Sequence, residues 1–186
     1  MVDFGHYPVF TDYAGSQSLG RETFIALLAD LVEGFVGQGV SRVAVLNSGA
    51  SQERPIRDAA ARFEGDSALQ IEILDFRTLG HGPDGLLEQE GGGHADEHET
   101  SSMLALAPET VRMELAVPAT GVGAPNAALP SPVRFSYDPA SGAAYNPMSA
   151  TGDSSLATPG KGRAFPDALI DDCGKALTTR WPDLQA

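Results

Sequence analysis

The chain has 186 residues, 42% of them hydrophobic, which suits one globular domain spanning residues 1–186 with a buried core. Its 12 basic residues stand against 25 acidic ones, a formal net charge of −13, and this balance argues against binding to nucleic acid or to an anionic membrane. The sequence shows neither a secretory leader nor an apolar run long enough to span a bilayer, so we expect a cytoplasmic protein.

The first half of the chain alternates predicted helices and strands. An amphipathic helix is predicted over residues 21–38, followed by a strand at 41–46, a helix at 53–63 and a strand at 69–76. The apolar face of the first helix is Phe24, Leu27, Leu28, Leu31, Val32 and Phe35. Because strand, helix and strand follow in this order, we expect right-handed crossovers, a largely parallel sheet and an α/β fold.

Polar residues stand at the ends of both predicted strands. Asn47 and Ser48 follow the first strand, and Asp75 lies at the end of the second. Open α/β sheets bind ligands at the carboxyl edge of their strands. These three residues are therefore predicted to bind substrate.

Residues 91–106 gather more candidate ligands than any other stretch. Three glycines precede His94, Glu97, His98 and Glu99, and an apolar helix is predicted to start near residue 100 or 101 and to end at 106. Glycine disfavours helix by about 1 kcal/mol per residue, which places His94 in a loop. One interpretation is that the acidic residues cap the positive end of this helix.

A zinc site is the other interpretation of the same residues. If a helix ran through them, His94 and His98 would lie one turn apart with Glu97 as a base, as in inverted His-x-x-Glu-His zinc peptidases.

Further on, residues 112–159 form a long Pro- and Gly-rich segment with one predicted strand at 133–137. A last helix is predicted at 166–179, with Trp181 packed at its end.

Four segments together resemble one family. The run at 94–111 is similar to His-Ala-Gly-Glu-x-Glu-Thr-Ser-x-Met-Leu-Ala-Leu-x-Pro-x-x-Val, a signature of the creatininase family, the creatinine amidohydrolases. Residues 13–19 resemble the Phe-Pro-Gly-Thr-x-Ser-Leu element before the family's long helix, and 43–47 resemble its Asn-Gly-His-Gly-Gly-Asn strand. Residues 151–162 resemble its C-terminal element, so the likeness covers nearly the whole chain.

This resemblance implies a three-layer α/β/α sandwich with a mostly parallel sheet, often oligomeric. Family members hydrolyse amide bonds, frequently cyclic ones, at a binuclear zinc or manganese centre, so a small-molecule amide is the implied substrate. By position His94 matches the histidine that moves a proton to the departing nitrogen, and Glu99 matches an acidic residue of the metal site. Asn47 opens the other loop that faces the site.

The sequence departs from the family at the metal ligands. The upstream Glu-x-His-Gly-x-His-x-x-x-x-x-Asp segment has no counterpart, and we expect the chain to begin after it. Aligned on Asn47, the ligand histidine becomes Gly49 and the final asparagine becomes Gln52. Because a catalytic metal needs about three protein ligands, we expect an incomplete metal site.

Substitute ligands for a mononuclear site are available on the loop and the N-terminal segment. They are Glu97, His98 and Glu99, with His94 and either His6 or Asp12. The chain is then a divergent metal-dependent amide hydrolase. Alternatively, it is a non-catalytic or partner-completed subunit in a homo-oligomer, or in a hetero-oligomer with a full-length relative that covers an exposed sheet edge. The third alternative is the zinc peptidase, which requires a helix through His94.

Overall fold

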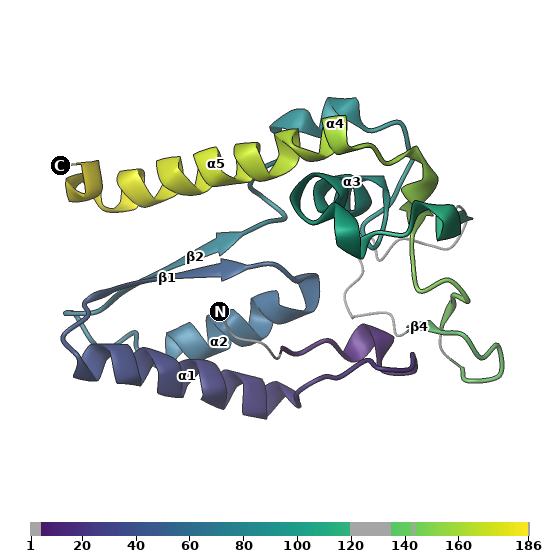
Figure 1. The fold of residues 1–186 in the computed structure, drawn as a ribbon. Helices are drawn as coiled ribbons and strands as arrows, with labels where there is room; N and C mark the ends of the chain where they lie inside the picture. Colours follow the sequence, from purple (N-terminus) through teal and green to yellow (C-terminus); the bar gives the residue numbers. More distant parts are fainter. Residues whose placement is uncertain (1–4, 120–134, 143, 186) are drawn as a thin grey trace. The chain divides into compact units, whose positions relative to one another are not determined.

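A computed structural model of the chain describes residues 5–119, 135–142 and 144–185 (Figure 1). The chain divides into two compact units. Unit 1 combines residues 1–8, 16–79 and 173–186, and unit 2 combines residues 9–15 and 80–172. In the described part of the chain, no helix is both long and apolar enough to cross a membrane.

Unit 1 is built on a parallel pair of strands. β1 (Arg42–Asn47) pairs with β2 (Gln70–Asp75) in a register that sets Asn47 opposite Asp75. Helix α1 (Arg21–Gly37) precedes β1, and α2 (Glu53–Ala61) connects the two strands. The predicted order of helices and strands in this half is thus confirmed, with boundaries within two residues of those expected.

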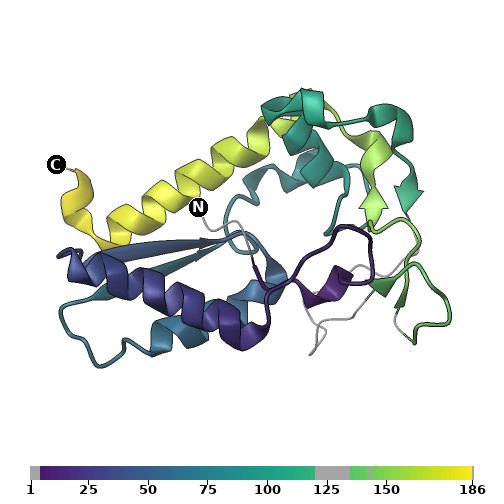
Figure 2. The ribbon, with the colours of Figure 1, turned by 60° about the horizontal axis from the view of Figure 1, so that its bottom comes forward.

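The buried stripe of α1 differs from the predicted one. Phe24, Ile25, Ala29 and Val32 are buried, and on α2 and β2 the core adds Ile56, Ala59 and Leu74. Leu31 and Phe35, expected inside, are 40% and 47% exposed. The reason is that α1 packs alongside α2, as Figure 2 shows, and this contact selects the stripe that contains the small residue Ala29.

The last helix supplies the other side of unit 1. α5 (Ala164–Arg180) confirms the helix predicted at 166–179, and its turns from residue 173 onward belong to unit 1. Trp181 is 5% exposed, and its indole Nε1 donates to Oε1 of Gln70 on β2 at 2.5 Å. In Figure 1, α1 and α2 lie on one side of the strand pair and these last turns on the other. The single mostly parallel sheet and the complete three-layer sandwich stay predictions.

Unit 2 is built on α3 (Glu97–Leu106) and α4 (Pro159–Gly162). They pack so closely that a Cβ on Gly162 would lie 1.7 Å from the carbonyl oxygen of Ser101. The hydroxyl of the fully buried Ser101 accepts a hydrogen bond from the N–H of Thr158 at 3.1 Å. Glycine is therefore required at residue 162.

The segment expected to be irregular, 112–159, contains short strands. β3 (Pro118–Ala119) pairs antiparallel with β6 (Gly152–Asp153), and β4 (Phe135–Ser136) pairs parallel with β5 (Ala144–Tyr145). The predicted strand at 133–137 contains β4, while residues 133–134 lie outside the described residues. The described 3₁₀ helices are η1 (Pro8–Phe10), η2 (Ala50–Gln52), η3 (Gly82–Leu86), η4 (Pro108–Thr110), η5 (Met113–Leu115), η6 (Ser154–Leu156) and η7 (Pro182–Gln185).

Candidate functional site

Helix α3 begins earlier than predicted because Asp96 caps it. Oδ1 of Asp96 accepts a hydrogen bond from the N–H of Glu99 at 3.0 Å, and Oδ2 accepts from the N–H of Gly93 at 2.7 Å. An N-cap carboxylate satisfies backbone donors that the first turn leaves free, and it favours helix despite the preceding glycines. The interpretation of the acidic run as a helix cap is therefore confirmed for Asp96.

Glu97 is held in a buried ion pair. Its side chain is fully buried, its Oε1 lies 2.5 Å from Nζ of Lys161, and its Oε2 accepts the N–H groups of Glu88 and Gln89 at 2.8 Å each. Burial alone would raise the pKa of Glu97, but hydrogen bonds from Lys161 and from these two N–H groups outweigh it and lower the pKa. Both carboxylate oxygens are engaged, which argues against Glu97 as a metal ligand or a base.

His98 also lacks the setting of a metal ligand. Its ring packs on Phe165, with the ring centroids 4.1 Å apart and an interplanar angle of 54°. The zinc peptidase alternative needs His94 and His98 on one helix, yet α3 begins at Glu97 and His94 forms an isolated β-bridge with Thr151. That alternative is therefore wrong, since the structure has no helix at His94.

His94 and Glu99 form an exposed acid–base pair at the start of α3. Nδ1 of His94 lies 3.9 Å from Oε2 of Glu99, and their side chains are 36% and 47% exposed. The N–H of Ala95 donates to the same Oε2 at 2.6 Å, and Ala95 has a left-handed φ of 49°, which is uncommon for a residue with a Cβ. With Nδ1 turned to the carboxylate, Nε2 of His94 is available to exchange a proton with a ligand.

Aromatic side chains support the His94 ring. Phe10 stacks on it with centroids 4.1 Å apart and an interplanar angle of 25°, and Phe10 also stacks on the buried Phe135 at 5.6 Å. Tyr13 packs on Phe10 and donates its hydroxyl to the carbonyl of Asn146. Burial, followed by the neighbouring charge of Asp12, raises the pKa of Tyr13, so this hydroxyl keeps its proton. The imidazole plane is therefore held by packing.

In unit 1, the predicted residues at the ends of β1 and β2 also meet. Nδ2 of the buried Asn47 donates to Oδ2 of Asp75 at 3.3 Å, whereas Ser48 is exposed. Nε of Arg77 donates to Oδ1 of Asp75 at 3.2 Å, and its guanidinium also bonds Glu53. Burial would raise the pKa of Asp75, but hydrogen bonds from Arg77 and Asn47 lower it. Asn47 and Asp75, both predicted to bind substrate, are thus hydrogen-bonded to each other, and Arg77 completes the hydrogen bonding of Asp75.

Side chains occupy the space beside Gly49, the position that aligns with the family's ligand histidine. A Cβ added to Gly49 would lie 2.7 Å from Nε2 of Gln52 and 2.9 Å from Cε1 of Tyr7. His6, proposed as a substitute metal ligand, also lies in unit 1, and its Nδ1 is 3.0 Å from the carbonyl oxygen of Leu19. A histidine at residue 49 would require Gln52 and Tyr7 to move.

The donor set does not fit a divalent metal. In residues 5–119, 135–142 and 144–185, no group of three or more His, Cys, Asp or Glu side chains is arranged to hold an ion. Outside these ranges, the sequence contains one further His, Cys, Asp or Glu residue, Asp3. Catalytic zinc needs about three protein ligands, so these residues do not supply a complete metal centre.

Sequence analysis did not single out Lys161 or Arg77 as partners of the candidate carboxylates. Lys161 pairs with a residue 64 positions away, which no local spacing reveals. A signal existed, because Lys161 is one of only two lysines and falls in the segment that resembles the family's C-terminal element. Arg77 lies two residues after Asp75, close enough to have been proposed as its partner.

Comparisons with known proteins agree with this fold. A solved creatinine amidohydrolase (creatininase) has 21% sequence identity and a TM-score of 0.72, with 96% of this chain and 73% of that chain covered. A manganese creatininase has 21% identity and a TM-score of 0.70, with 96% of this chain and 73% of that chain covered. A Zn–Zn type creatininase variant has 18% identity and a TM-score of 0.73, with 96% of this chain and 72% of that chain covered. No curated protein matches the chain.

A parallel strand pair with helices, and polar residues at its carboxyl edge, define an α/β protein. The family model described as "Creatininase: Creatinine amidohydrolase" matches residues 1–177. The chain belongs to the creatininase family.

Proposed function

We propose that this chain is a partner-completed subunit for creatininase-type hydrolysis of small-molecule amides. It contributes the proton-transfer pair His94 and Glu99, while the divalent zinc or manganese ion is held by ligands from a full-length relative. The observation that carries the proposal is that this acid–base pair is exposed, with side chains 36% and 47% accessible, while the described residues form no metal-binding group.

His94 has the setting of a group that moves a proton. Stacking on Phe10 fixes the imidazole plane, and Oε2 of Glu99 lies 3.9 Å from Nδ1 of the same ring. Nε2 would then donate a proton to the nitrogen that departs when an amide bond is cleaved.

A partner has a place to pair on unit 1. In the described part of the chain, β1 pairs along one edge with β2, and no strand pairs with its other edge. Unpaired strand edges accept a strand from another chain. A homo-oligomer would bring further copies of the same incomplete donor set, so we favour a hetero-oligomer with a full-length family member.

The test separates proton transfer by this chain from metal binding by the relative. In the full-length relative, the histidine that corresponds to His94 is replaced by alanine, so that only this chain can supply the proton. The relative is then co-purified with this chain. We expect the complex to bind zinc or manganese and to hydrolyse a cyclic amide such as creatinine. His94→Ala in this chain should abolish that hydrolysis, because no other residue supplies the proton. His81→Ala is the matched control, since this exposed histidine of unit 2 pairs with the neighbouring Asp84.

Two outcomes would contradict the proposal. If this chain alone retains one equivalent of zinc or manganese in elemental analysis and hydrolyses the amide, it is a self-sufficient hydrolase. If the complex forms and binds metal but stays inactive with His94 intact, the non-catalytic alternative holds instead.

A further inference from the structure

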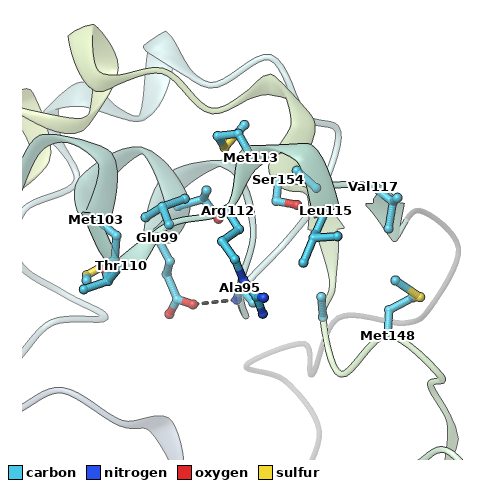
Figure 3. Close-up of a pocket in the computed structure, with 14 residues that line it drawn as sticks. Ala95, Glu99, Met103, Thr110, Arg112, Met113, Leu115, Val117, Met148 and Ser154 are labelled. Atoms are coloured by element: carbon cyan, nitrogen blue, oxygen red, sulfur yellow. Dashed lines mark hydrogen bonds between the residues drawn. The ribbon is translucent and has the colours of Figure 1, made fainter. Parts of the chain in front are cut away.

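A pocket of about 520 Å³ opens beside Glu99 in unit 2. Its walls come from the first turns of α3, from the segment between η4 and β3, and from residues near 148–154 (Figure 3). This volume is in the range of pockets that bind small molecules. Of the predicted site residues, only Glu99, predicted for the metal site, lies in the wall of this pocket.

The pocket has a flexible apolar wall. Its large side chains are exposed, at 42% for Met103, 57% for Leu115, 41% for Val117 and 48% for Met148. Exposed apolar side chains that gather in one place, instead of being scattered, mark a binding surface. Methionine adapts its shape to a ligand, so the wall suits an unbranched or branched aliphatic group.

Two opposite charges stand in this apolar wall. Figure 3 shows Glu99 and Arg112 extending in the same direction, with Ala95 between their ends. No ion pair within 4.0 Å joins them, and the guanidinium of Arg112 bonds no other described residue. Arg112 is thus a cation without a described partner in a chain whose net charge is −13. Its planar guanidinium would bind a carboxylate through two parallel hydrogen bonds.

We propose that this pocket binds an amide that carries both a carboxylate and an aliphatic side group, such as an N-acyl amino acid. The carboxylate binds Arg112, the aliphatic group lies against Met103 and Met148, and the amide faces Glu99, 3.9 Å from His94. This assignment of a substrate class rests on the proposed function of the His94–Glu99 pair. It makes Arg112 a specificity-determining residue.

The test is binding without turnover, measured by titration calorimetry on the full chain. N-acetyl-L-methionine is the probe, and N-acetyl-L-methionine amide, which lacks the carboxylate, is its matched ligand. We expect the acid to bind about 10-fold more tightly than the amide, the effect of a charge-assisted hydrogen bond. Arg112→Gln should remove that difference by weakening the acid alone. N-acetylglycine, without the side group, should bind about 10-fold more weakly than N-acetyl-L-methionine.

Arg163→Gln is the control variant, since Arg163 is exposed and pairs with Asp167 away from the pocket. It should leave both affinities unchanged. Equal binding of acid and amide by the unmodified protein, or an Arg112→Gln variant that still prefers the acid, would overturn the assignment. Because binding is measured without a partner or a metal, a failure of hydrolysis in the complex would leave this result intact. Hydrolysis in the complex without acid-selective binding would overturn the assignment of substrate class alone.

Discussion

Replacing Glu97 by glutamine tests whether the buried ion pair holds unit 2 together. Oε2 of Glu97 faces two N–H donors, from Glu88 and Gln89, and Oε1 faces the ammonium of Lys161. A glutamine must turn its own NH₂ group either towards the two N–H groups or towards the ammonium, so donors face donors in both orientations. Removing one member of a buried pair costs about 3–5 kcal/mol because the other charge stays buried without compensation.

Differential scanning calorimetry at pH 7 measures this effect. For a chain of this size each kcal/mol corresponds to roughly 2–4 °C, so we expect Glu97→Gln to lower Tm by about 10 °C. Glu88→Gln is the matched control, because Glu88 bonds the same Nζ at the same 2.5 Å but its side chain is 66% exposed. An exposed pair contributes about 1 kcal/mol or less. Equal, small effects of the two variants would refute the reasoning, since burial would then not matter.

Two further predictions concern stability. The pKa values of Glu97 and Asp75 are lowered from 4.5 and 3.8, so their contribution is present above those values and is lost as pH falls through the lower folded-state pKa. Urea unfolding from pH 7 to pH 3 should show declining stability, and Asp75→Asn should flatten the decline; an unchanged slope would count against this assignment. Gly162→Ala should destabilise by about 3 kcal/mol because its Cβ would meet the backbone oxygen of Ser101, whereas Gly160→Ala in the same helix meets nothing within 4 Å and should be neutral or slightly stabilising. Similar melting temperatures for the two alanine variants would contradict the close packing of α3 and α4.

Unit 1 was predictable from sequence because its elements are long and their signals are local. The 17-residue α1 and the six-residue β1 and β2 have clear periodicity and end at glycines or polar residues. The placement of Asn47 and Asp75 at the same edge followed from the strand–helix–strand order, and the parallel register sets them opposite each other. The inward stripe of α1 was predicted less well, because the partner helix selects which apolar residues are buried.

Unit 2 was predicted less well because its structure depends on contacts between distant segments. The start of α3 moved to Glu97 because the side chain of Asp96 caps the helix, an effect that outweighs the unfavourable propensity of the glycines before it. The strands of the segment at 112–159 are two residues long and pair with each other, so no periodicity announces them. The role of Glu97 depends on Lys161, which is distant in the chain.

The chain's own cations explain why carboxylates that look like ligands do not form a metal site. Lys161 binds Glu97, and Arg77 binds Asp75 and Glu53, so the buried carboxylates of Glu97 and Asp75 each already have a positive partner. A divalent ion at either place would have to displace an ammonium or a guanidinium and leave it buried without its partner, at a cost of several kcal/mol. Glu99, by contrast, accepts the N–H of Ala95, lies near His94 and has no lysine or arginine partner among the described residues. In unit 2 the side chains of His94 and Glu99 thus stay accessible, at 36% and 47% exposed, whereas that of Glu97 is buried in its ion pair with Lys161.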